Sequence, residues 1–172
     1  MAKGGLATRF ATGIPLLVVA LALIWVPSLA VVWFAFIAII AGVGLTEYSG
    51  ILHAKGLQPE RIAVVAGGVS VVAAAYAGGL LWSCAVLFAA ALVVGFLHVT
   101  GRSPSIAGIA GDMFGLVYVG WFPAHVVMIH QQPEIGPGMI TVLIVAVALT
   151  DIGAYFMGKG FGKHKLAPVV SP

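Results

Sequence analysis

Two long stretches without a charged side chain constrain this chain more than any other feature. No Asp, Glu, Lys or Arg lies between Arg9 and Glu47, or between Arg61 and Arg102. A single helix over the first stretch would be roughly 55 Å long at about 1.5 Å per residue, whereas the hydrocarbon core of a bilayer is about 30 Å thick. Each stretch is therefore predicted to hold two membrane-spanning helices rather than one.

The predicted fold is an all-α, polytopic membrane helix bundle that forms a single domain over residues 1–172. The first helix pair divides at Pro27-Ser28 and the second near Gly78-Gly79, because proline and glycine interrupt helices. Two further apolar stretches complete a set of six transmembrane helices. They are predicted at about 10–27, 28–47, 62–79, 80–98, 106–129 and 138–158.

Composition excludes the main alternative classes. The chain is 62% hydrophobic and 8% charged, whereas about a quarter of the residues in soluble domains are charged. The single cysteine, Cys84, rules out an internal disulfide and a cysteine-based zinc site. The net charge of +3 is small, and we attribute it to membrane topology rather than to nucleic-acid binding.

The positive charges predict the orientation of the bundle. Every lysine and arginine precedes helix 1 or follows helices 2, 4 and 6, and the turns after helices 1, 3 and 5 contain none. These basic residues are Lys3, Arg9, Lys55, Arg61, Arg102, Lys159, Lys163 and Lys165. By the positive-inside rule, both chain ends are predicted to be cytoplasmic. Ser28-Leu29-Ala30 loosely resembles a signal-peptide cleavage site, but the next span follows at once, which favours an uncleaved first helix.

Three acidic residues lie within the predicted helices or at their edges: Glu47, Asp112 and Asp151. A carboxylate at the centre of a membrane helix costs about 2.5–3.5 kcal/mol on insertion scales, so these side chains should face the bundle interior or a wet cavity. Simpler interpretations exist for the first two, namely an interfacial cap or ion pair for Glu47 and contact with boundary water for Asp112. Asp151 is the deepest, and it shares a helix face with Tyr155 and two small residues.

A glycine-spaced basic segment, GKGFGKHK at 158–165, follows Asp151 directly. Glycines let backbone amides approach an anion, and three lysines and a histidine supply positive charge. The spacing differs from that of a Walker motif. On these residues alone, phosphate contact and anchoring to anionic lipid headgroups remain open alternatives.

The end of the chain resembles a known family, bacterial CDP-diacylglycerol synthase (phosphatidate cytidylyltransferase). TDIGAYFMG at 150–158 and FGKHKLAP at 161–168, followed by Ser171-Pro172, carry the resemblance. Arg9 before Thr12-Gly13, Glu47-Tyr48 and GLVYVG at 115–120 are weaker matches, and the resemblance covers the whole chain in order.

The resemblance implies a nucleotidyltransferase of phospholipid biosynthesis in the cell (inner) membrane, with a cytoplasmic active face. It would transfer a cytidylyl group from CTP to phosphatidate and would require Mg²⁺. Asp151 is then the expected catalytic residue, with Glu47 and Asp112 as supporting residues and no assigned metal ligand. The expected substrate-binding residues are Tyr155, Lys159, Lys163, His164, Lys165 and Ser171. CTP, phosphatidate and the lipid bilayer are the expected partners, and a homodimer is left open.

The family pattern continues beyond Ser171-Pro172 with a Lys-Lys-Thr type segment and a later signature whose aspartates bind the catalytic metals. We therefore expect the chain to be the N-terminal portion of a longer enzyme, or a natural truncation, that is inactive alone. Two alternatives from other classes are a small multi-pass transporter or channel subunit, with Asp151 in an ion path, and a non-catalytic membrane scaffold.

Overall fold

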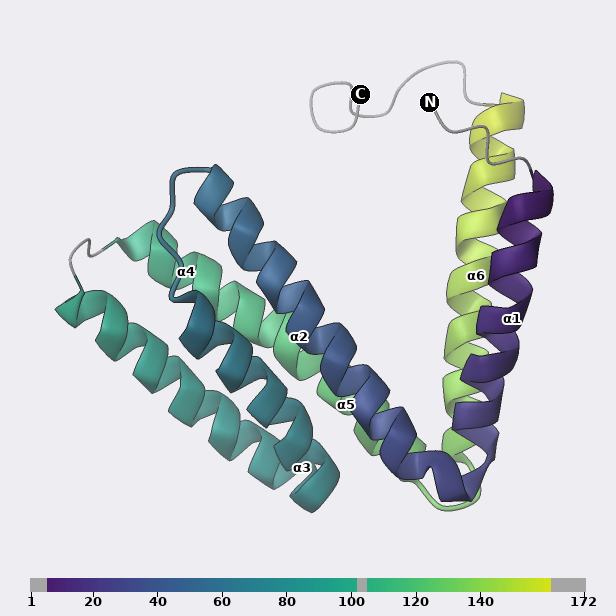
Figure 1. Cartoon of the computed structure of the whole chain (residues 1–172), viewed down its shortest axis with the longest axis horizontal. Coiled ribbons are helices and arrows are strands. Elements are labelled where there is room, and N and C mark those ends of the chain that lie inside the picture. The colour runs from purple at the N-terminus through teal and green to yellow at the C-terminus, as the bar shows by residue number, and fades with distance from the viewer. Residues whose placement is uncertain (1–5, 102–104, 162–172) are drawn as a thin grey trace.

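The computed structural model describes residues 6–101 and 105–161, and every regular element within these ranges is helical. α2 and α3, which itself doubles back, pack with the span α4–η2–α5, and α1 and α6 diverge from this bundle (Figure 1). The predicted all-α class is confirmed for the described residues.

The first two helices meet where the sequence predicts a break. α1 (Leu6–Trp25) is followed by a short 3₁₀ turn, η1 (Pro27–Leu29), and then by α2 (Ala30–Ala54). Pro27 stands at the start of the turn, where its missing N–H costs least. α2 continues beyond the predicted end at Glu47 as far as Ala54, and Gly56, with a φ of 83°, follows shortly after it.

α3 (Arg61–Thr100) doubles back within its length. Gly78 and Gly79 leave the helical conformation, and Gly79 has a φ of 68°, which glycine adopts without strain. The two halves form a helical hairpin, as the predicted turn near Gly78-Gly79 requires (Figure 1).

The next span contains a stretch of π-helix. α4 (Ile106–Gly115) leads into η2 (Leu116–Trp121), which leads into α5 (Phe122–His130). Pro123, which has no amide N–H, is the second residue of α5, just after the π-helix. Gly120 within η2 lies against Gly68 of α3, so that a Cβ on Gly120 would come within 3.0 Å of the Gly68 Cα. The two backbones thus approach closely, as expected of glycines at a helix crossing in a membrane.

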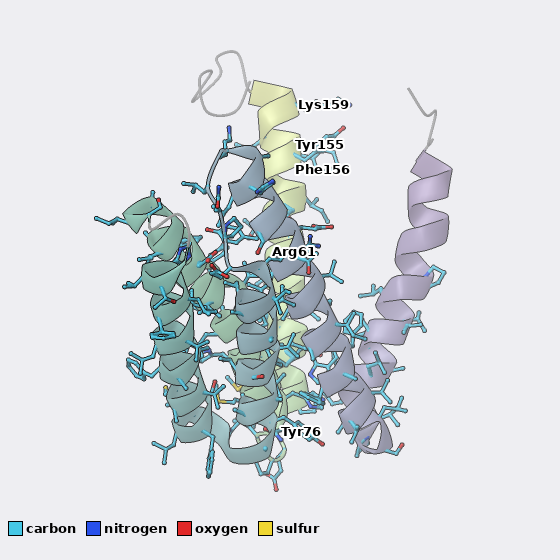
Figure 2. All side chains as sticks on the ribbon, turned by 60° about the vertical axis from the view of Figure 1, so that its left-hand side comes forward. Arg61, Tyr76, Tyr155, Phe156 and Lys159 are labelled. Carbon is cyan, nitrogen blue, oxygen red and sulfur yellow. The ribbon has the colours of Figure 1, made fainter. Side chains whose placement is uncertain are left out.

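α6 (Gly136–Phe161) closes the described chain and is the least buried of the long helices. It contacts α1 near the turns, where Trp25 Nε1 donates a hydrogen bond of 3.0 Å to Thr141 Oγ1. Beyond this point α1 and α6 spread apart (Figure 2).

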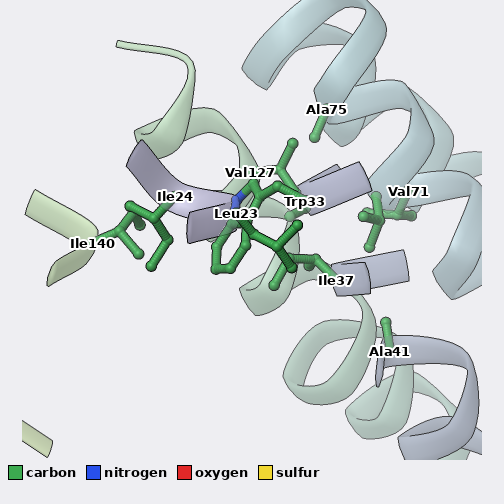
Figure 3. Packing of buried hydrophobic residues seen from close by; sticks show 11 residues of the cluster. Leu23, Ile24, Trp33, Ile37, Ala41, Val71, Ala75, Val127 and Ile140 are labelled. Carbon is green, nitrogen blue, oxygen red and sulfur yellow. The ribbon is translucent and has the colours of Figure 1, made fainter. Parts of the chain in front are cut away.

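The main apolar core joins α1, α2, α3, α5 and α6 near the same turns (Figure 3). Trp33 and Ile37 of α2 lie at its centre, and Ile24 and Ile140 connect it to α1 and α6. A second, smaller cluster joins α2, α3 and η2 farther along the bundle and consists of Leu45, Val64, Val94 and Leu116.

Four described segments are long and apolar enough to cross a membrane. They are Pro27–Ala54, Arg61–Thr100, Ile106–His130 and Gly136–Gly160. The second of these folds back on itself, and α1 is not among them. A count of six spans, and a cytoplasmic location for both ends, remain predictions.

Candidate functional site

The polar end of α6 carries the residues singled out in the sequence. Asp151, Tyr155 and Lys159 follow one another at intervals of four residues and so lie along one helix face. All three are exposed, and Figure 2 shows Tyr155 and Lys159 near the free end of α6. The Nζ of Lys159 lies 5.9 Å from the centroid of the Tyr155 ring, a cation–π contact. This end of α6 thus presents a carboxylate, a phenol and an ammonium group together.

Asp151 also borders a cavity of about 470 Å³ between α2, α5 and α6. The other lining side chains are apolar: Trp33, Ile37, Val126, Ile140, Leu143, Ile144, Val147 and Ala148. Asp151 is therefore the one charged residue at an otherwise hydrophobic cleft. A carboxylate in this position can bind a cation, a lysine or a hydroxyl group at the edge of the apolar cavity, and the cavity itself can hold a hydrocarbon chain.

The structure leaves four of the expected substrate-binding residues untested. Lys163, His164, Lys165 and Ser171 lie outside the described residues. Their roles stay predictions, and the described site consists of Asp151, Tyr155 and Lys159.

Glu47 does not join Asp151. It is exposed on α2 and lines a different groove, which α2 forms with α3. It forms no ion pair with Lys55 or Arg61, so the simpler interpretation of Glu47 as half of such a pair is wrong for the structure.

Asp112 is fully buried, as expected of a carboxylate that faces the bundle interior. Its Oδ2 lies 2.8 Å from Nε2 of His98 and accepts a second hydrogen bond, also 2.8 Å, from the backbone N–H of Glu60. Its Oδ1 is buried without a partner in the described part of the chain. Nearby, the Tyr48 hydroxyl donates to the Gly111 carbonyl at 2.9 Å. These contacts connect α4 to α2, to the end of α3 and to the α2–α3 loop, so Asp112 belongs to the bundle rather than to the α6 site.

Sequence reasoning assigned no role to His98. The one signal available in the sequence was that His98 and Asp112 lie next to the same predicted membrane boundary. In the structure these two are the only buried ionisable residues of the described chain. A histidine and a carboxylate that both lie at one boundary of adjacent helices are candidates for a pair.

The described residues do not form a metal site by themselves. In the ranges 6–101 and 105–161, no three His, Cys, Asp or Glu side chains gather to hold an ion. Asp151 supplies a single carboxylate at the end of α6. Mg²⁺ is often bound through one or two carboxylates together with substrate phosphates and water, so further ligands would have to join Asp151.

Comparisons with a family model and with individual proteins both identify cytidylyltransferases as similar to this chain. The model of the cytidylyltransferase family matches residues 7–172. The phosphatidate cytidylyltransferase of Mycobacterium bovis is 30% identical over 91% of this chain and 54% of its own length. That of Synechocystis is 26% identical over 80% of this chain and 56% of its own length. That of Pseudomonas aeruginosa is 54% identical over a shorter stretch, 27% of this chain and 17% of its own length.

The chain spans about half the length of the first two of these relatives. No solved structure gives a significant match.

Proposed function

Since the chain belongs to the cytidylyltransferase family, we propose that it forms part of a phosphatidate cytidylyltransferase. The observation that carries this proposal is the family match over residues 7–172, which includes the polar end of α6. The substrates would be CTP and phosphatidate, and the products CDP-diacylglycerol and pyrophosphate.

In this reaction an oxygen of the phosphatidate phosphate attacks the α-phosphorus of CTP. A new P–O bond forms, the bond between the α-phosphorus and the bridging oxygen breaks, and pyrophosphate leaves with the electron pair. Both reactants are polyanions, so the site must offset negative charge and align the attacking and leaving oxygens. Mg²⁺, when bound, would supply part of that charge.

The described residues suit parts of this task. Lys159 offers an ammonium group for a phosphate, and its contact with the Tyr155 ring restricts where that group lies. Asp151 would orient a cation, a lysine or a substrate hydroxyl. The apolar cleft that Asp151 borders would accept hydrocarbon next to the reacting headgroup. Lys163, His164, Lys165 and Ser171 would add phosphate contacts.

We further propose the cellular setting. The chain would cross the inner membrane six times with both ends in the cytoplasm, where CTP is available. The clustering of lysines and arginines in alternate loops of the sequence supports this orientation. Association as a homodimer is part of the proposal.

The function is tested with the complete protein that contains this chain, purified in detergent and supplied with radiolabelled CTP. We expect a labelled lipid product whose formation requires both phosphatidate and Mg²⁺. A purified, folded protein that forms no CDP-diacylglycerol under these conditions would contradict the proposal.

A further inference from the structure

A small polar cavity lies at the loop between α2 and α3. Figure 1 shows this loop on the bundle, apart from the end of α6 that carries Lys159. The cavity has a volume of about 380 Å³, and it is lined by Ser49, Gly50, His53, Gln58, Pro59 and Arg61. Ser49 is 1% exposed, and its Oγ has no hydrogen-bond partner in the described part of the chain.

The charge around this cavity favours an anion. Arg61 is the first residue of α3, where the helix dipole is positive, and it forms no ion pair with a described carboxylate. His53 and the Gln58 amide provide further donors in the lining. The nearest acid in sequence, Glu60, does not line this polar cavity, but it lines the adjoining space of about 890 Å³ together with Arg61, and its Oε1 lies near Gly101. The guanidinium group of Arg61 is thus available for a phosphate.

The polar cavity continues into an apolar groove between α2 and α3. A space of about 890 Å³ shares Pro59 and Arg61 with it, and a third space of about 570 Å³ extends this groove between the two helices. Thr46, Val65 and Val69 line both of the larger spaces. The space of about 570 Å³ reaches Ala38 and Ile39, well inside the apolar part of α2. A ligand that fills the whole groove must carry an anionic head and a hydrocarbon chain.

We propose that this groove binds an anionic glycerophospholipid. Its phosphate lies in the polar cavity against Arg61, with His53 and Gln58 as further donors, and one acyl chain follows the groove between α2 and α3. Glu47 also lines the space of about 570 Å³, and its side chain is exposed. The site is separate from the polar end of α6, and the proposal concerns binding alone, so it does not depend on the proposed function.

Binding is measured by native mass spectrometry of the detergent-solubilised full chain, titrated with dioleoyl phosphatidylglycerol. This lipid is an anionic phosphodiester and not the proposed substrate, so the readout is independent of turnover. R61Q removes the charged donor, and we expect it to weaken binding at least about tenfold, because charge-assisted hydrogen bonds to phosphate are stronger than neutral ones. K55Q is the matched control, because Lys55 carries the same charge on the same loop but does not line the cavity.

G50L tests the cavity without removing a charge. A Cβ at Gly50 has nothing within 4 Å, so a leucine side chain fits there and fills space that the ligand would use. We expect G50L to weaken binding at least as much as R61Q. Wild-type affinity in folded G50L would overturn the proposal, as would equal losses in R61Q and K55Q. Inorganic phosphate must not displace the lipid at millimolar concentration, since displacement would identify a free-phosphate site instead.

Discussion

The Nε2 of His98 lies 2.8 Å from the Oδ2 of Asp112, and this pair joins the end of α3 to α4. Both side chains are buried, with 2% and 0% of their surface exposed. The same carboxylate oxygen accepts the backbone N–H of Glu60, so one acidic side chain connects three segments. In an apolar bundle, this polar contact defines how the second half of α3, α4 and the α2–α3 loop meet.

Removal of the Asp112 carboxylate should destabilise the bundle. D112A leaves the buried His98 ring and the partly buried Glu60 N–H without their acceptor, which costs up to about 1–3 kcal/mol for each unsatisfied group. D112N keeps one oxygen acceptor in a side chain of the same shape, so we expect a smaller loss. Thermal unfolding in detergent, followed by circular dichroism, checks the order wild type, D112N, D112A. A D112A protein as stable as the wild type would show that the pair contributes nothing.

The crossing of Gly68 and Gly120 should tolerate no added methyl group. A Cβ at Gly120 would lie 3.0 Å from the Cα and 3.8 Å from the carbonyl carbon of Gly68, and backbone cannot move aside as a side chain can. We expect G120A to lower the stability of the bundle by about 1–3 kcal/mol, as overpacked sites do.

G95A provides the matched control for that crossing. Gly95 is also helical, but a Cβ there meets nothing within 4 Å, and alanine favours a helix by up to about 1 kcal/mol over glycine. The same melting experiment should therefore find G95A at least as stable as the wild type. Equal losses in G95A and G120A would argue against the close approach.

Lys159 should contribute to the use of CTP or phosphatidate through its charge. We expect K159Q in the complete protein to lower kcat/KM by about tenfold or more, since charge-assisted hydrogen bonds contribute about 1.5–3 kcal/mol. K159R keeps the charge and should retain most of the activity, whereas K55Q removes a lysine from a different loop and should retain all of it. If K159Q and K159R are equally impaired, charge is not what Lys159 supplies.

The orientation of the bundle can be measured by cysteine labelling in a Cys84→Ser background. Gln131 donates a hydrogen bond to the Tyr76 carbonyl, which places the α5–α6 loop beside the α3 hairpin turn, at the opposite end of the bundle from Lys55 (Figure 1). An impermeant maleimide added to intact cells should label Q131C and leave K55C unlabelled. The reverse pattern would invert the proposed topology.

Hydropathy and backbone chemistry were enough to predict much of the fold. The charge-free stretches required turns, and Pro27 and Gly78-Gly79 were the residues able to make them. The spacing of Asp151 and Tyr155 likewise predicted their common helix face. Each of these features depends on residues that are close together in the sequence.

Features that depend on packing between helices could not be predicted in the same way. His98 meets Asp112 fourteen residues away only because α4 folds back along α3. The unpaired Ser49 hydroxyl is unremarkable in the sequence, since most serines on a helix bond to their own backbone or to water. The π-helix at Leu116–Trp121 has no distinctive residue pattern, and it is evident only where η2 crosses α3.

The most direct measurement is CTP-dependent formation of CDP-diacylglycerol by the complete protein carrying D151N. Asparagine keeps the size of the side chain but loses its charge, so we expect activity to fall at least about a hundredfold. The melting temperature should not change, because Asp151 is exposed and has no hydrogen-bond partner in the described residues. E134Q is the matched carboxylate-to-amide control in the distant α5–α6 loop and should remain fully active. Near-normal turnover of folded D151N would remove Asp151 from the active site and contradict the proposed role of the polar end of α6.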